Sequence, residues 1–301
     1  MTMPPISTTA PFAGRTVHRV GYGAMQLERL HDDRDAALAF LRHAIDLGVD
    51  HIDTAEFYGN TFVNGLIRDT LRPGDDVLVV SKVGADPNPE GPLPLRPAQR
   101  PHELRASVED NLKTLGVEQI GVVNLRRMDT RPGVLAEGAQ LVDLDDQLEV
   151  MTALRDEGKI GAIGLSSVTL EILRRALPAG IACVQNAYSL VSRDDEDMLE
   201  LCVAEDIAWV PFFPLGGAFP GLPKVTDEPA VHTVAESLGR TPSQIGLAWL
   251  LHHAPNVHLI PGTATAGHLE ENMAAGAIVF DDATLATLDA VPSRSQDVAL
   301  G

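Results

Sequence analysis

Cysteine is nearly absent from this sequence of 301 residues, which contains only Cys183 and Cys202. Two cysteines in apolar stretches indicate neither a disulfide framework nor a zinc site with cysteine ligands, and we expect both to be small buried hydrophobic residues. The spacing of His51, His252 and His253 matches no metal motif such as His-Glu-x-x-His. We therefore expect no metal site.

Basic residues are also scarce, with 23 Lys and Arg against 42 Asp and Glu, a formal net charge of −19. This charge should repel nucleic acid and acidic membrane surfaces, so we expect neither as a partner. The sequence has no apolar run of membrane-spanning length, and residues 1–14 lack the basic and apolar segments of a signal peptide. We expect a cytoplasmic protein, and the sequence has no signature of oligomeric state.

Short β-branched apolar runs alternate from residue 17 onward with longer segments of helical periodicity, a pattern typical of βα units around a parallel sheet. We expect eight strands, at residues 17–21, 49–53, 77–82, 120–125, 162–165, 182–185, 208–212 and 257–260. Eight helices should accompany them, at residues 34–47, 61–71, 101–115, 145–158, 169–177, 194–206, 227–238 and 265–275. Two further helices, at 241–253 and 281–290, are expected as additions.

No break in composition divides the chain, and α/β barrels reach this length as one domain. The sequence thus predicts a single (β/α)8 TIM barrel of the α/β class over residues 1–301, with extra C-terminal helices and a segment 1–14 that can be flexible. A Rossmann fold is the main alternative. It is disfavoured because residues 21–23 lack the third glycine of a dinucleotide fingerprint, and residues 161–164 lie before or within a strand.

Three charged residues, Asp53, Lys82 and Arg126, fall at the ends of consecutive predicted strands, and Tyr58 follows the first of these strands. Parallel strands should bring them together at the barrel mouth, formed by segments 84–101, 126–144 and 213–226. A phenol has a pKa of about 10, which a nearby ammonium lowers, and a carboxylate can hold that ammonium in place. Tyr58 is therefore a candidate general acid, although singly each residue could be a turn cap or a solvated rim charge.

These residues belong to ordered motifs through which the chain resembles the aldo-keto reductases, a family of (β/α)8 enzymes that use a nicotinamide cofactor. The motifs lie at residues 21–26, 53–59, 81–82, 158–167, 184–186, 211–217, 260–263 and 271–272 and extend over nearly the whole chain. The resemblance implies that Tyr58 is the general acid, that Lys82 lowers its pKa, and that Asp53 positions Lys82.

A histidine is missing from this set. The family's Leu-His-x-x-Asp stretch falls on residues 125–129, where Arg126 replaces the histidine. Arginine stays protonated and cannot relay a proton, but it can orient a carbonyl group and stabilise a developing alkoxide. A second cation should also favour the phenolate of Tyr58 and shift the pH optimum downward. Alternatively, Arg126 pairs with Asp129 or Asp53 and only holds the rim together.

The resemblance also implies a cofactor site. Ser166, Ser167 and Gln185 correspond to the residues that bind the nicotinamide carboxamide, with Ser167 at a position where asparagine is usual. Phe212 stands where an aromatic ring often stacks on the nicotinamide, although it could also be an ordinary core residue. The full expected set is Gly23, Ala24, Met25, Asp53, Ser166, Ser167, Gln185, Phe212, Phe213, Pro214, Leu215, Gly216, Pro261, Gly262, Thr263, His268, Glu271 and Asn272.

At the adenosine end of this site, the lysine or arginine that often binds the 2′-phosphate of NADP is absent. The chain has Gly262, Ala264 and His268 there. Thr263, Thr265 and His268 could still bind a phosphate through hydrogen bonds. We expect NADPH as cofactor from the resemblance, with NADH open.

These features predict an NADPH-dependent oxidoreductase that reduces an aldehyde or ketone, its small-molecule partner, to an alcohol. Residues 122–126 and 211–217 resemble a bacterial subgroup associated with pyridoxal reduction, so conversion of pyridoxal to pyridoxine is the specific expectation. A nicotinamide-binding sensor or regulatory subunit with little turnover is an alternative that rests only on the missing histidine. A Schiff-base enzyme with Lys82 as nucleophile is another, but it leaves the cofactor motifs unexplained.

Overall fold

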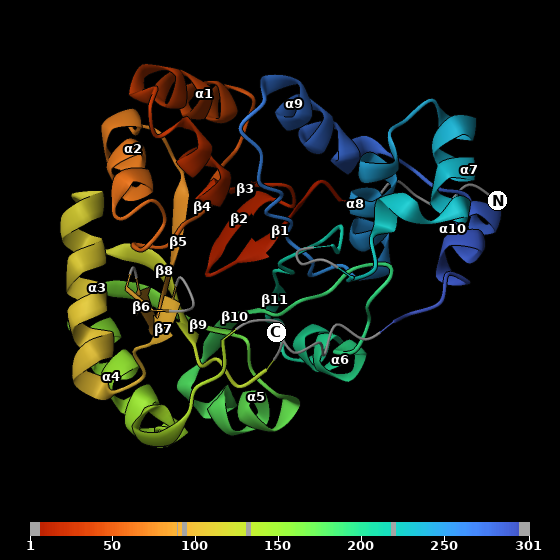
Figure 1. Cartoon of the computed structure of the whole chain (residues 1–301). Helices are drawn as coiled ribbons and strands as arrows, with labels where there is room; N and C mark the ends of the chain where they lie inside the picture. The colour runs from red at the N-terminus through yellow and green to blue at the C-terminus, as the bar shows by residue number, and fades with distance from the viewer. Residues whose placement is uncertain (1–6, 89, 92–94, 131–133, 218–220, 295–301) are drawn as a thin grey trace.

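The computed structural model describes residues 7–88, 90–91, 95–130, 134–217 and 221–294, which fold around a parallel sheet (Figure 1). Seven strands lie in chain order: β3 (Tyr22–Gly23), β4 (His51–Asp53), β5 (Leu78–Val83), β8 (Ile120–Arg126), β9 (Ile160–Ser166), β10 (Ile181–Gln185) and β11 (Ala208–Trp209). The segment around Leu259 joins the two edges of this sheet through parallel bridges from Val20 to Leu259 and from Trp209 to Val257. The predicted (β/α)8 barrel is confirmed.

Helices cover the outside of the sheet, as Figure 1 shows. They are α1 (Arg34–Asp46), α2 (Phe62–Thr70), α3 (Pro101–Leu115), α4 (Leu144–Asp156), α5 (Leu170–Ala176), α6 (Glu196–Ala204), α7 (Pro229–Leu238), α8 (Pro242–His253), α9 (Ala266–Ala274) and α10 (Asp282–Asp289). Short 3₁₀ helices are η1 (Ala24–Leu30), η2 (Gly138–Gln140), η3 (Leu177–Ala179), η4 (Val225–Asp227) and η5 (Ala275–Ala277), and β6 (Ala85–Pro87) pairs with β7 (Leu95–Pro97). Within the described residues, no helix is long and apolar enough to cross a membrane.

The roles expected for two helices are exchanged. Residues 241–253 were expected as an addition to the barrel, but α8 is the helix that packs on it, with residues 244–251 all buried. Helix α7 buries only Val231, Val234 and Ala235 and packs against α8 and α10, so it is the outer addition (Figure 1). A helix that is apolar on every side belongs inside a protein, and the sequence of α8 has this character.

An antiparallel hairpin, β1 (Thr9–Phe12) and β2 (Arg15–His18), precedes the barrel and covers one of its ends. The first strand was expected at residues 17–21, but Val17 and His18 belong to this hairpin, and the barrel strand follows it. Phe12 is buried and contacts the rings of His51 and His258, both at the start of barrel strands. The hairpin therefore closes the amino-terminal end of the barrel. It includes part of segment 1–14, for which the sequence allows flexibility.

Burial of His258 at this closed end should make stability depend on pH. Burial, and then the neighbouring His51, lower the pKa of His258 to about 3, against about 6.5 in an unfolded chain. Between these values the unfolded chain binds a proton that the folded protein excludes, so stability falls as the pH drops, by up to about 1.4 kcal/mol per unit. We expect His258→Gln to flatten the dependence of the unfolding free energy on pH in this window.

Denaturant unfolding at several pH values measures this slope. His102, exposed on α3, provides the matched control, because His102→Gln should leave the slope as in the wild type. Equal slopes for His258→Gln and the wild type would contradict the prediction.

Candidate active site

The carboxyl ends of five neighbouring strands meet at the open end of the barrel. Asp53, Arg126, Ser166 and Gln185 are the last residues of β4, β8, β9 and β10, and Lys82 is the penultimate residue of β5. The register places Arg126 beside Ser166, and Ser166 beside Gln185. The polar residues selected from the sequence are thus brought together from distant parts of the chain, because parallel strands end at the same edge.

A buried ion pair lies at the centre of the site. Lys82 Nζ donates to Asp53 Oδ1 and, at 3.0 Å, to the carbonyl oxygen of Thr54, while Gln185 Nε2 donates to Asp53 Oδ2 at 2.7 Å. Burial lowers the pKa of Lys82, but Asp53 and Tyr58 together raise it above the ordinary value. Lys82 is therefore a fixed ammonium, which disfavours the Schiff-base alternative because that chemistry needs a neutral amine.

Tyr58 lies beside this ammonium, in the loop between β4 and α2. Its ring centroid is 5.1 Å from Lys82 Nζ, and Phe57 packs against it edge-on at 5.2 Å. The following residue, Gly59, donates its backbone N–H to Glu28 Oε1 at 2.8 Å, so η1 supports the loop. A half-buried phenol next to a cation is suited to donate a proton.

Sequence reasoning missed both Thr54 and Glu28. The position of Thr54 next to Asp53 at a strand end is a signal that could have identified it. Glu28 has no such signal, because its partner is a main-chain N–H.

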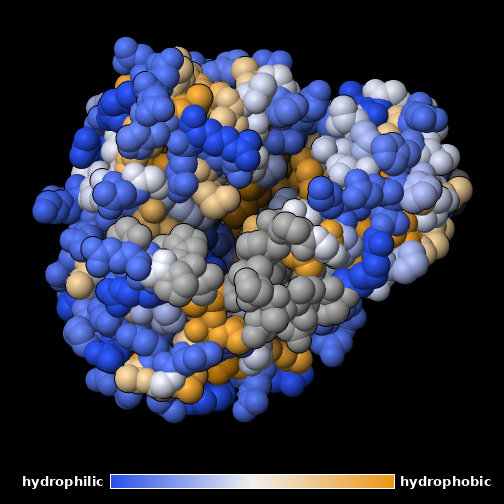
Figure 2. Space-filling model, in the orientation of Figure 1, coloured by the Kyte–Doolittle hydropathy of each residue, from blue (hydrophilic) through white to orange (hydrophobic). Residues whose placement is uncertain are grey.

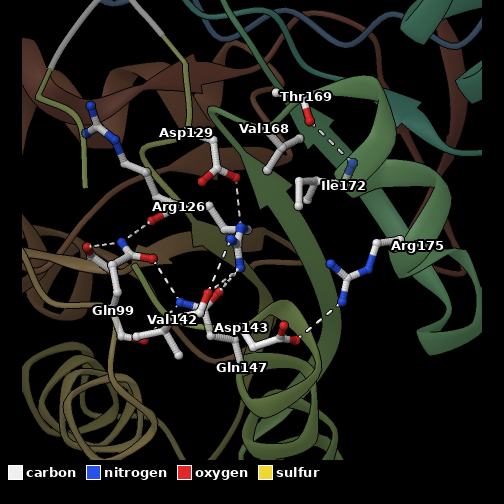
Figure 3. Close-up of polar contacts among 12 residues, drawn as sticks. Gln99, Arg126, Asp129, Val142, Asp143, Gln147, Val168, Thr169, Ile172 and Arg175 are labelled. Carbon is white, nitrogen blue, oxygen red and sulfur yellow. Dashed lines mark hydrogen bonds and ion pairs between the residues drawn. The ribbon is translucent and has the colours of Figure 1, made fainter. Parts of the chain in front are cut away.

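Arg126 is a cation without a carboxylate partner among the described residues. Arg127 Nε binds Asp129 instead, at 2.7 Å, and Asp53 is held by Lys82. Figure 3 shows the guanidinium of Arg126 directed away from Asp129, and its Nε is buried without a hydrogen-bond partner in the described structure. Burial lowers the pKa of Arg126, and the negative charge of an ionised Tyr58 opposes that shift. The rim pairing considered for Arg126 is thus absent from the described contacts.

The residues expected at the carboxamide end of a nicotinamide lie together at the ends of β9 and β10. Ser166, Ser167 and Gln185 are all buried, and Ser167 donates its backbone N–H to the Gln185 carbonyl oxygen at 3.0 Å. Gln185 Oε1 is buried and has no partner within the described residues. An amide N–H of a nicotinamide fits such an acceptor, so these residues are suited to the expected cofactor.

The glycines expected at the cofactor site approach each other closely. A Cβ on Gly23 would lie 2.4 Å from the carbonyl oxygen of Ile260, and one on Gly262 would lie 3.0 Å from that of Gly23. Tyr22 fixes the same contact, because its hydroxyl donates to the Thr263 carbonyl oxygen at 2.7 Å. Segment 261–263, with Pro261, therefore lies against the end of β3, and only glycine fits at position 23.

The remaining expected cofactor residues lie in three places around this contact. Ala24 and Met25 begin η1, with Ala24 buried and Met25 exposed. Segment 212–216 follows β11. The backbone N–H of Phe212 donates to the Asn186 carbonyl oxygen, and Gly216 has a positive φ. Between them lie Phe213, Pro214 and Leu215. His268 is exposed in the first turn of α9, and Glu271 and Asn272 lie in its second half. In Figure 2 the surface is hollowed at the centre of this face, with hydrophobic residues along the wall of the hollow.

Comparison with known proteins identifies this arrangement. A family model described as the aldo/keto reductase family matches residues 19–292. The chain belongs to the aldo/keto reductase family. The resemblance predicted from the motifs is confirmed, and the chain is an oxidoreductase of this family.

Individual relatives agree with this identification. The chain is 41% identical over 292 residues to pyridoxine 4-dehydrogenase of Escherichia coli (strain K12), covering 95% of this chain and 98% of that protein. A crystal structure of an aldo-keto reductase from Klebsiella pneumoniae in complex with NADPH is 26% identical with a TM-score of 0.79, covering 98% of this chain and 100% of that one. A Klebsiella pneumoniae structure with NADP and acetate has 25% identity, a TM-score of 0.78 and the same coverage.

Proposed function

We propose that this aldo/keto reductase reduces an aldehyde or ketone to an alcohol, with Tyr58 as the proton donor. The observation that carries the proposal is the position of the Tyr58 ring beside the buried pair of Lys82 and Asp53. When bound, a reduced nicotinamide would supply a hydride to the carbonyl carbon. Tyr58 then gives its proton to the carbonyl oxygen, Lys82 stabilises the phenolate that is left, and Asp53 holds Lys82 in place.

Arg126 is proposed to act on the substrate rather than on the rim. Its guanidinium, which has no carboxylate partner among the described residues, can donate to the substrate's oxygens and stabilise negative charge on them as the carbonyl is reduced. It cannot take over the proton transfer of a histidine, because it does not lose its proton at neutral pH. The roles of donor and charge stabiliser are thus divided between Tyr58 and Arg126.

NADPH is the proposed cofactor. Gln185 Oε1 and the hydroxyls of Ser166 and Ser167 would hold the carboxamide, and the two Klebsiella pneumoniae structures contain NADPH or NADP. At the other end, Thr263, Thr265 and His268 would bind the 2′-phosphate through hydrogen bonds, because no lysine or arginine is present among residues 261–272. NADH remains the competing cofactor, and the protein is proposed to act in the cytoplasm.

Pyridoxal is the proposed substrate. The name of the Escherichia coli relative describes oxidation of pyridoxine, which is the reverse of pyridoxal reduction. Pyridoxal is an aromatic aldehyde with a phenolic oxygen next to the reacting group, and Arg126 is suited to bind that oxygen.

The test measures loss of reduced-nicotinamide absorbance with pyridoxal and, separately, with a panel of simple aldehydes. We expect kcat/KM for pyridoxal to exceed that for benzaldehyde by about tenfold or more, as one well-placed charged hydrogen bond provides, and NADPH to be used in preference to NADH. Equal kcat/KM values for pyridoxal and benzaldehyde would refute the proposal that pyridoxal is the substrate. Tight NADPH binding without turnover of any aldehyde would instead favour the sensor alternative.

A further inference from the structure

Two buried glutamines, Gln99 and Gln147, connect the end of β5 with the end of β8 (Figure 3). Gln99 precedes α3, and its Nε2 donates to the carbonyl oxygens of Gly84 at 2.6 Å and Arg126 at 2.7 Å. Gln147 of α4 donates through its own Nε2 to the Gln99 carbonyl oxygen at 2.8 Å and to Gln99 Oε1 at 2.9 Å. Each amide nitrogen thus serves two oxygens, and no amide hydrogen is left unused.

The direction of this chain of hydrogen bonds is set by Arg127. A guanidinium can only donate, and Arg127 Nη1 donates to Gln147 Oε1 while its Nε is held by Asp129. The amide nitrogen of Gln147 must therefore face Gln99, and that of Gln99 must face the two carbonyl oxygens. Turning either amide over would place oxygen against oxygen in a site closed to water, which is costly.

The two hydrogen bonds donated by Gln99 thus fix the main chain at Gly84 and Arg126. Gly84 adopts a φ of +103°, and a Cβ there would lie 2.3 Å from the Arg126 carbonyl oxygen, so the two strand ends approach as closely as glycine allows. The guanidinium of Arg126 forms no ion pair within the described residues, whereas the next residue, Arg127, pairs with Asp129. The place at the barrel mouth where the Arg126 side chain leaves the backbone is thus determined by the contacts of the Arg126 carbonyl oxygen.

We propose that Gln99 and Gln147 are positioning residues that fix the backbone of Arg126 and thereby aim its guanidinium at the substrate. The proposal rests on the proposed function of Arg126. The glutamines touch neither substrate nor reacting atoms. The two glutamines therefore affect the binding of the carbonyl compound but not the binding of the cofactor.

The test replaces Gln99 by glutamate, which keeps the shape of the side chain but turns a carboxylate oxygen toward the carbonyl oxygens of Gly84 and Arg126. For the aldehyde that the wild type reduces best, we expect Gln99→Glu to raise KM about tenfold. The dissociation constant of NADPH, measured by fluorescence quenching, should change less than about twofold. Gln147→Glu still accepts from Arg127 and should raise KM in the same direction by a smaller factor, which provides a second variant if Gln99→Glu does not fold.

A double-mutant cycle with Arg126→Met shows whether the effect passes through the guanidinium. In the Arg126→Met background, Gln99→Glu should raise KM no further. Gln119, an exposed residue whose Nε2 donates to the Gly158 carbonyl oxygen at 3.0 Å, gives the matched control, because Gln119→Glu should leave KM unchanged.

Three results would overturn the proposal, and they separate it from the proposed function. A folded Gln99→Glu with wild-type KM, while Arg126→Met raises KM, overturns the positioning role alone. The same rise in KM with and without Arg126→Met shows a route that does not involve Arg126. An unchanged KM in Arg126→Met, with a raised KM in Gln99→Glu, overturns the substrate role of Arg126 as well.

Discussion

Tyr58→Phe should lower kcat about a thousandfold while leaving the affinity for NADPH within about twofold. The substitution removes only the hydroxyl that donates the proton, and the ring can keep its place beside Lys82 and Phe57. Hydride transfer then has to leave negative charge on the substrate oxygen without a proton from the protein. Single-turnover absorbance of bound NADPH measures the chemical step directly, and fluorescence quenching measures the cofactor affinity.

Tyr188 supplies the matched control. Its hydroxyl donates to Glu196 of α6 and lies 2.9 Å from Nε2 of His253 in α8. Tyr188→Phe should lower the melting temperature yet keep kcat within about twofold of the wild type, because its hydroxyl belongs to the scaffold. A Tyr58→Phe enzyme with kcat within about tenfold of the wild type would show that the proton comes from another group.

Lys82→Met should lower the free energy of unfolding by about 3–5 kcal/mol, because it leaves the carboxylate of Asp53 buried without a cation. Asp53 is 3% exposed, and its other side-chain partner, Gln185, is a neutral amide. Turnover should also be lost, since the phenolate formed at Tyr58 would have no ammonium beside it. Denaturant unfolding followed by circular dichroism measures the first effect, and aldehyde reduction the second.

Removing both charges separates stability from catalysis. Lys82→Met with Asp53→Asn should recover part of the lost stability, because no charge is then left unpaired, but it should recover no activity. Lys159→Met serves as a control, because Lys159 pairs with Glu109 and Glu157 at the surface, and the loss of an exposed ion pair should leave stability almost unchanged. A stable, active Lys82→Met enzyme would exclude the proposed role of the ion pair.

Much of the barrel could be predicted because its strands and helices have different periodicities. The helix expected at 101–115 matches α3, whose ends are marked by Pro101 and by Gly116 in the left-handed region. The errors occurred where two elements adjoin. Val17 and His18 lie directly before the barrel strand, and β-branched residues suit a hairpin as well as a barrel.

The candidate site could be predicted in part because most of its residues lie at strand ends. Asp53, Lys82, Arg126 and Gln185 each lie at or near a strand end, and parallel strands bring such positions together. Gln99 and Glu28 could not be identified, because their partners are main-chain groups of Gly84, Arg126 and Gly59, which carry no signal in the sequence. Sequence patterns show where side chains gather, but not which backbone atoms they contact.

The contacts of the hairpin at the closed end can form only late in the synthesis of the barrel. Phe12 rests against His258, and Arg19 Nε donates to the carbonyl oxygen of Val257, 238 positions further along the chain, at 2.9 Å. These contacts cannot form until the segment around Leu259 has left the ribosome. The hairpin therefore waits for a segment that is synthesised more than two hundred residues later, and the sheet keeps an open edge until the strand around Leu259 covers it.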